Sequence, residues 1–165
     1  MSDFEFIRSY IDAIPRSDRV DRDHSVVVSE YALKPGLDSV QIDKKHQQFP
    51  YDLPSELLVF YSFSYGCTLN EHELLGFDQI EESLSSLRDT YVDQWEGRFI
   101  PFAYHRGVGD YVLFDLSEVN SEGEPLIVDG FHELPPDQWK SICYGLESWL
   151  RSFIQNDCEV FWLEE

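Results

Sequence analysis

The sequence predicts an α+β fold in which helices pack against an antiparallel sheet of about five or six strands. The first observation behind this prediction is a run of three strand-like segments, Phe99–Tyr104, Asp110–Leu116 and Pro125–Asp129, separated only by short turn-like connections. Parallel strands need a long crossover between them, so these neighbours are expected to pair antiparallel. The second observation is that segments with apolar residues at helical spacing lie on both sides of this run.

The N-terminal part is predicted to form a helix and then a strand. Ser2 and Glu5 have capping-box spacing, and the apolar positions of 3–14 recur at helical spacing before Pro15. The β-branched run in 25–33 favours a strand. Residues 34–52 are polar and are interpreted as an irregular connection with room for one short helical turn.

The segments around the predicted three-strand run alternate between helix and strand. Pro54 suits the first position of a helix, and Gly66 suits its end. One or two short strands are expected within 69–77, and helical spacing of apolar residues predicts a helix over 78–95. The glycines at 107 and 109 are interpreted as a hairpin turn that needs positive φ angles.

The C-terminal part is expected to supply the helix that covers the sheet. The sequence Pro135-Pro136-Asp137 is typical of a helix start. Its apolar face would consist of Trp139, Ile142, Leu146, Trp149, Leu150 and Phe153. Trp95 and Trp139 are interpreted as core residues, with interface anchors as the alternative. A terminal strand over 159–163 is the last expected element.

Length and composition indicate one globular domain, 1–165. Hydrophobic residues make up 42% of the chain and aromatic residues 15%, which argues against disorder. The three cysteines are an odd number without C-x-x-C spacing, so neither a disulfide framework nor a zinc site is expected. With an acidic N-terminus that does not resemble a signal peptide, this cysteine usage predicts a cytoplasmic protein.

A series of short motifs follows a recognisable order between Leu53 and His132. The motifs are, in order, Leu53-Pro54, Gly66 after a helix-like run, Leu74-Leu75-Gly76, Trp95 closing an acidic segment, Phe99-Ile100-Pro101-Phe102, the pair Gly107 and Gly109, Leu113-Phe114-Asp115, and Leu126-Ile127-Val128-Asp129. This order resembles the SUKH superfamily of small α+β domains. The resemblance covers 53–132, about half the chain, and residues 1–46 carry none of it. The chain departs from the family where Tyr65-Gly66-Cys67 replaces the frequent Asn-Gly-Gly.

The resemblance implies a non-enzymatic protein-binding module. The superfamily includes bacterial immunity proteins against polymorphic toxins and fungal regulators of cell-wall synthesis. An immunity protein would act by occupying a toxin domain, whereas a regulatory scaffold would bind a housekeeping partner. The resemblance also implies that Asp115 and Asp129, which close two strands, shape the partner-binding face, although aspartate at a strand exit is also a simple turn former.

Charge is distributed very unevenly along the chain. The formal net charge is −20; residues 1–46 hold 7 basic and 9 acidic residues, so residues 47–165 carry −18. A field of this sign repels nucleic acid and anionic membranes and attracts basic proteins, such as a toxin domain with a basic surface. A general contribution of acidity to solubility is the alternative interpretation. The residues expected to bind such a partner are Glu71, Glu73, Asp78, Asp110, Asp115, Glu118, Glu122, Glu124 and Asp129.

Sequence motifs for catalysis or cofactor binding are missing. His72-Glu73 begins an H-E-x-x-H pattern, but Gly76 stands where the second histidine belongs. There is no P-loop and no G-x-S-x-G pattern, so no catalytic residue, metal ligand or cofactor is predicted. The alternative is a hydrolase or metal enzyme that uses His105, Asp129 and His132, since histidine and carboxylate suit both roles.

Overall fold

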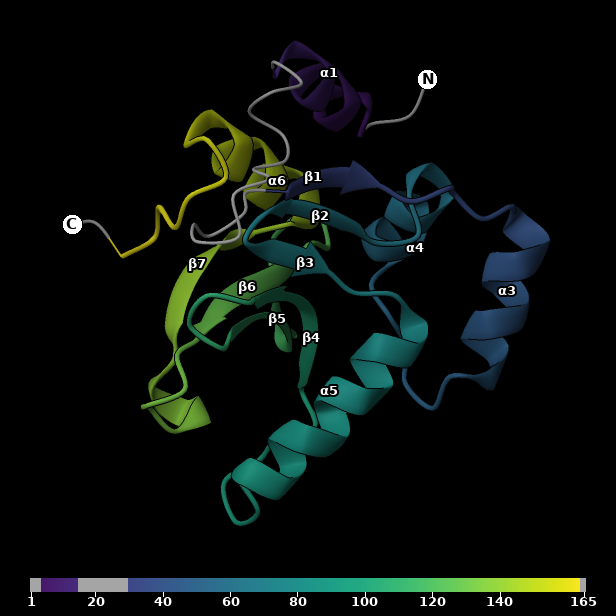
Figure 1. The fold of residues 1–165 in the computed structure, drawn as a ribbon. Helices are drawn as coiled ribbons and strands as arrows, with labels where there is room; N and C mark the ends of the chain where they lie inside the picture. Colours follow the sequence, from purple (N-terminus) through teal and green to yellow (C-terminus); the bar gives the residue numbers. More distant parts are fainter. Residues whose placement is uncertain (1–3, 15–29, 164–165) are drawn as a thin grey trace.

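The computed structural model describes residues 4–14 and 30–163, and the strands in this part of the chain form one seven-stranded antiparallel sheet (Figure 1). The strands are β1 (Glu30–Leu33), β2 (Cys67–Asn70), β3 (His72–Leu74), β4 (Phe99–His105), β5 (Asp110–Val119), β6 (Pro125–Gly130) and β7 (Lys140–Tyr144). Their order in the sheet is the same as their order in the sequence. The predicted α+β class and antiparallel pairing are therefore confirmed, with slightly more strands than the five or six expected.

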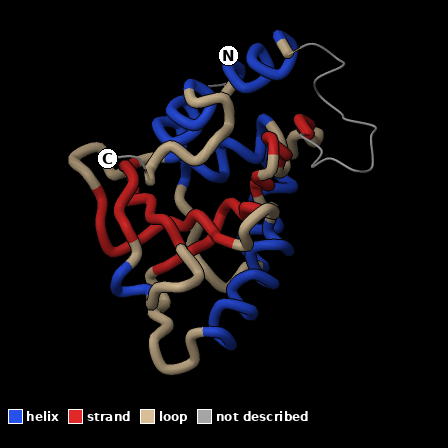
Figure 2. The backbone as a smooth tube through the Cα atoms, turned by 60° about the vertical axis from the view of Figure 1, so that its left-hand side comes forward, coloured by secondary structure: helices blue, strands red, loops and turns tan. Residues whose placement is uncertain are grey.

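Within the described residues, five α-helices and a short 3-10 helix lie around this sheet. They are α1 (Glu5–Ala13), α3 (Ser39–Gln48), α4 (Ser55–Phe63), α5 (Phe77–Thr90), η1 (Pro136–Gln138) and α6 (Leu146–Gln155). Figure 2 shows the strands gathered in one layer with helices beside and above it. None of the helices in the described ranges is long and apolar enough to cross a membrane.

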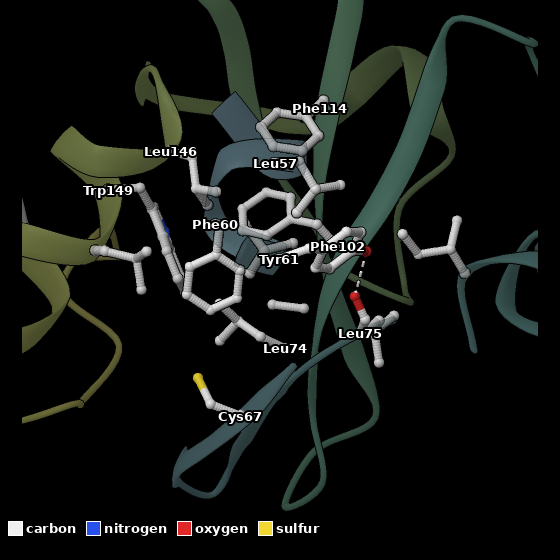
Figure 3. Close-up of a cluster of buried hydrophobic side chains, with 14 of the residues drawn as sticks. Leu57, Phe60, Tyr61, Cys67, Leu74, Leu75, Phe102, Phe114, Leu146 and Trp149 are labelled. Atoms are coloured by element: carbon white, nitrogen blue, oxygen red, sulfur yellow. Dashed lines mark hydrogen bonds between the residues drawn. The ribbon is translucent and has the colours of Figure 1, made fainter. Parts of the chain in front are cut away.

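The larger core lies between one face of the sheet and helices α1, α4 and α6. Figure 3 shows Phe60 of α4 and Trp149 of α6 facing Phe102 and Phe114 of the sheet. Phe102 stacks on Phe114 at 4.4 Å and meets Trp149 edge-on at 5.3 Å between ring centroids. Full burial of one such side chain contributes about 1.5–3 kcal/mol. The Tyr61 hydroxyl in this core donates a 2.6 Å hydrogen bond to the carbonyl of Leu75.

A smaller core occupies the opposite face of the sheet. Side chains alternate along β5, so Leu113 points away from the face that carries Val112 and Phe114. It packs there with residues from the end of α5 and just after it, from β4, from β6 and from the segment before β7: Leu87, Tyr91, Phe99, Leu126, Val128 and Trp139. Trp95 packs against the same cluster. Trp139 is therefore a core residue and Trp95 packs against the core, but neither lies on a helix, since Trp95 follows α5 and Trp139 lies between η1 and β7.

The segment 34–52 differs from the predicted irregular connection because it contains the ten-residue helix α3. Its start is fixed by a capping box, in which the Asp38 side chain accepts from the Gln41 backbone N–H at 2.8 Å. The Gln41 side chain in turn accepts from the Asp38 N–H at 3.0 Å. Only Ile42 of α3 is buried, which explains why no apolar periodicity indicated the helix.

The predicted C-terminal helix from Pro135 is also wrong in its extent. The segment divides into η1, strand β7 and helix α6, because Gly145 has a φ of 89° and separates β7 from α6. Strand β7 pairs with β6 and so provides the additional strand. The predicted strand over 159–163 is wrong as well: the chain turns after α6, and Trp162 from this segment packs into the larger core.

Other element predictions are confirmed with shifted ends. The helix after Pro54 is α4, the short strands within 69–77 are β2 and β3, and the helix over 78–95 is α5, which ends at Thr90. The predicted N-terminal helix is present as α1, while the Ser2 end of its capping box lies outside the described residues. Of the strand predicted over 25–33, only Glu30–Leu33 falls within them.

The glycine pair after β4 has two different explanations. Gly109 has a φ of 80° and fits the predicted hairpin turn. Gly107 is not in the positive-φ region, so that part of the prediction is wrong. A Cβ atom added to Gly107 would lie 2.8 Å from Oε2 of Glu71, so the Glu71 carboxylate, which contacts His105, would have to shift.

Candidate functional site

An acid-lined hollow lies at one end of strand β5, between the start of α4, the β5–β6 turn and the start of α6. Its volume is about 390 Å³. Five carboxylates line it: Asp52, Glu56, Glu122, Glu124 and Glu147. No basic side chain is among the described residues of its lining. We call this feature the acidic hollow.

Glu56 positions one wall of the acidic hollow by joining α4 to α6. Its Oε1 accepts from the backbone N–H of Leu146 at 2.5 Å, and its Oε2 accepts from that of Glu147 at 2.9 Å. These are the first amides of α6, which has no side-chain cap of its own. A carboxylate at this end of a helix is favoured by the helix dipole. Glu56 is therefore a scaffold residue, and Glu147 is held beside it.

The opposite wall is formed by the β5–β6 turn, in which Asn120 fixes two acidic residues. Its Oδ1 accepts from the backbone N–H groups of Glu122 at 3.0 Å and Glu124 at 2.9 Å. Its Nδ2 donates to Oε1 of Glu124 at 3.0 Å. The other oxygen of Glu124 lies against Gly145, where a side chain would collide with it. The turn therefore presents Glu122 to solvent and holds Glu124 half-buried in a fixed position.

The negative charges of this region also affect the pKa of a neighbouring thiol, that of Cys143. Burial, and then the charges of Glu56 and Glu124, raise the pKa of Cys143 to about 11. The thiolate form is disfavoured because it would add another negative charge beside two carboxylates. All three cysteines of the chain are described and are free thiols.

The structure brings only part of the predicted partner-binding set to the acidic hollow. Glu122 and Glu124 line it, and Glu118 lies exposed on the adjoining end of β5. Asp52, Glu56 and Glu147 were not singled out from the sequence. Asp52 and Glu56 meet Glu147 only through folding, because Glu56 and Glu147 are 91 residues apart in the sequence. No local pattern could have indicated this.

Asp115 is a buried and fully engaged carboxylate. It is 4% exposed, and it accepts from the backbone N–H of Ser117 at 3.0 Å and from its hydroxyl at 2.7 Å. Its second oxygen lies 3.3 Å from Nη1 of Arg98. Asp115 does not close its strand as expected, because β5 continues to Val119; its contacts lie where the pairing of β5 with β6 becomes irregular.

Three further acidic residues of the predicted set lie near β3 and α5, away from the acidic hollow. Glu71 pairs with His105 at 3.0 Å, and Glu73 accepts from Nε2 of Gln79 at 2.8 Å. Asp78 is exposed in the first turn of α5. Two of these carboxylates therefore have local partners.

A second cavity, of about 260 Å³, lies at the other end of β5. It brings together the remaining candidates Asp110 and Asp129 with the two histidines of the enzyme alternative, His105 and His132. Nδ1 of His132 lies 2.6 Å from Oδ1 of Asp110, and this hydrogen bond raises the pKa of His132. Within the described part of the chain no group of three or more potential ligands is arranged to hold a metal ion.

His72 lines the same cavity and was considered in the sequence only as part of a failed zinc motif. Its side chain is 1% exposed, and neither ring nitrogen has a hydrogen-bond partner among the described residues. The ring stacks on His105 with centroids 4.2 Å apart. Burial, and then the proximity of His105, lower the pKa of His72 to about 3, so the imidazole is neutral at physiological pH.

Comparison with known families gives a match over most of the chain. The model of the SMI1/KNR4 family, also named SUKH-1, matches residues 36–152. This range begins before α3 and ends within α6, and it includes both walls of the acidic hollow. The comparison with curated protein sequences gives no match.

Proposed function

The chain belongs to the SMI1/KNR4 (SUKH-1) family, and from this premise we propose that it is a non-enzymatic immunity protein that neutralises a toxin by binding a basic surface at the acidic hollow. Membership of this family supports a role as an immunity or regulatory module. The observation that carries the finer proposal is the hollow itself, with five carboxylates and no basic side chain among its described lining residues.

The chemistry of the acidic hollow suits lysine and arginine side chains. Such side chains combine an apolar stem with a charged head. The hollow offers both surfaces, because Val59 and Val119 beside the carboxylates are 47% and 58% exposed. Exposed Asp52 and Glu122 are available to the charged head, whereas Glu56 is occupied by the amides of α6.

The charge of the whole domain supports the same kind of partner. Residues 47–165 carry −18, so a basic protein would be attracted before contact. A nuclease toxin is a natural class of partner, because its nucleic-acid site must be basic to bind phosphates. An acidic inhibitor would occupy such a site with complementary charge.

A captured partner provides the test. Tagged protein would be used to isolate its partner from the native host, and association and dissociation rates would then be measured by surface plasmon resonance at several salt concentrations. Because exposed charges are screened over roughly 8 Å at physiological salt, association is expected to slow as salt rises, while dissociation changes less. A toxin encoded beside this gene would support immunity, and a housekeeping partner would support a regulatory scaffold.

Charge-reversal variants test whether the acidic hollow is the binding site. The double variant Asp52→Lys, Glu122→Lys changes the acidic hollow, and Glu81→Lys, Glu82→Lys makes the same change in charge on the exposed side of α5. We expect the first to slow association about tenfold or more at low salt and the second to have a clearly smaller effect. Equal effects of the two variants, or an association rate that does not depend on salt, would contradict the proposal.

A further inference from the structure

The cavity at the Asp110 end of β5 contains two buried polar side chains, an imidazole without a hydrogen-bond partner and a carboxylate without an ion pair among the described residues. We call it the histidine cavity. One group is the imidazole of His72, which is 1% exposed and has no hydrogen-bond partner among the described residues for either ring nitrogen. Buried polar atoms in native proteins are nearly always hydrogen-bonded, and an exception calls for a bound molecule or another explanation.

The second group is the carboxylate of Asp129. It is 6% exposed, and no described side chain forms an ion pair with it. Burial raises the pKa of Asp129, and the nearby indole N–H of Trp162 and the charge of Lys140 oppose this rise, although the Trp162 N–H lies outside hydrogen-bonding geometry. Lys140 of the neighbouring strand β7 pairs with Asp129 of β6, and the Lys140 side chain is exposed. A buried carboxylate without a cation is costly, and a cationic ligand would remove that cost.

The rest of the cavity is mainly apolar and aromatic. Its walls include Val112, Phe131, Val160 and Trp162. Asp110, also in the lining, is already engaged by His132 through its Oδ1. An apolar cavity with a few convergent polar groups is the usual form of a small-molecule site. Aromatic rings beside a carboxylate additionally favour an organic cation.

From these observations we infer that the histidine cavity binds a small organic amine, with its cationic nitrogen at Asp129, its apolar body between the aromatic walls, and a hydrogen-bonding group at His72. The volume of about 260 Å³ suits a molecule with one ring and a short chain. The site is at the opposite end of β5 from the acidic hollow and does not depend on the proposed function.

The test compares three molecules of similar shape by nuclear magnetic resonance titration of 15N-labelled protein. Phenethylamine is the cation, 3-phenylpropionate the matched anion, and tyramine the cation with an added hydroxyl group. We expect phenethylamine to shift the indole N–H signal of Trp162 with a Kd on the order of 1 mM or below, and the anion to leave it unchanged. Equal responses to cation and anion would overturn the inference.

Variants separate specific binding from general attraction to an acidic protein. Asp129→Asn should weaken phenethylamine binding about tenfold or more, whereas Glu122→Gln, which removes one charge at the other end of β5, should leave it within about twofold. Equal weakening by both variants would mean non-specific attraction and would overturn the site. This comparison leaves the proposal on the acidic hollow untouched, because that proposal predicts an effect of Glu122 on protein partners only.

The role of His72 has a separate readout that does not depend on the Asp129 variant folding. Tyramine should bind more tightly than phenethylamine to the unaltered protein, and His72→Phe should abolish this difference. Equal affinities of the two amines in unaltered protein would overturn the contact with His72. Because a lysine side chain carries the same cationic chemistry, Nα-acetyl-lysine N-methylamide, whose side-chain amine stays free, is titrated as well. Tighter binding of this amide than of phenethylamine would overturn the assignment to a free small molecule.

Discussion

The buried neutral imidazole of His72 makes the stability of the fold dependent on pH. In the native state its pKa is lowered from 6.5 to about 3, first by burial and then by His105. Below pH 6.5 the unfolded chain binds a proton that the native state does not, so stability is lost as the pH falls from 6.5 towards 3. At pH 8 both states are neutral and this effect vanishes. At pH 5 the loss from this group amounts to about 2 kcal/mol.

The variant His72→Phe tests this reasoning because it keeps a flat ring in the stack with His105 but cannot bind a proton. Urea denaturation of both proteins at pH 8 and pH 5 gives the difference in free energy of unfolding at each pH. The other titrating groups are common to both proteins, so their contributions cancel in the difference. We expect the difference to move by about 2 kcal/mol in favour of the variant between pH 8 and pH 5. A difference that is the same at both values would refute the reasoning.

His132 provides a matched control with the opposite sign. Its pKa is raised, first by the hydrogen bond to Asp110. A raised pKa gives stability that is fully present below the pKa of the unfolded state and is lost as the pH rises through the folded value. The variant His132→Gln should therefore be less stable relative to the unaltered protein at pH 5 than at pH 8. The same direction of change in both histidine variants would indicate a general effect of pH on the fold.

Three further substitutions test contacts that hold the elements together, each measured by chemical denaturation at neutral pH. Glu56→Gln replaces a carboxylate that accepts hydrogen bonds from two backbone N–H groups of α6, and it should lower the free energy of unfolding by about 1–3 kcal/mol. An unchanged stability would mean that water takes over the lost hydrogen bond. Tyr61→Phe leaves the carbonyl of Leu75 without its buried donor and should also cost about 1–3 kcal/mol. Gly145→Ala, at a φ of 89° and against Glu124, should cost about 1–3 kcal/mol, and a neutral result would show that the turn adapts.

Much of the sheet could be predicted from the sequence because its signals are local. Short connections between 99–104, 110–116 and 125–129 required antiparallel neighbours, and the structure shows them as β4, β5 and β6. Strand β7 was missed because Trp139 and Ile142 continue the apolar spacing of α6, so helix and strand fit the same pattern. The backbone angle of Gly145 decides between them, and that angle is not visible in the sequence.

The candidate sites could be predicted only where acidic residues are neighbours in the sequence. Glu122 and Glu124 stand in one turn, and they were expected to form a partner surface. Glu56 contributes to the same hollow by binding amides 90 and 91 residues away, which is a tertiary contact. His72 fits the ordinary alternation of side chains along β3, so the sequence gives no sign of its surroundings. Only its packing against His105 and Phe153 in the structure shows that the imidazole is buried without a hydrogen-bond partner among the described residues.

The sequential order of the seven strands has a consequence for how the chain acquires its structure. Each strand pairs with the strand just before it, so the sheet can grow stepwise as the polypeptide leaves the ribosome, with small loop-closure costs. Its larger apolar face is completed only by Trp149 and Phe153 of the last helix, α6. Nascent chains that lack α6 would therefore carry an open hydrophobic sheet face, the kind of surface that chaperones bind and that promotes aggregation.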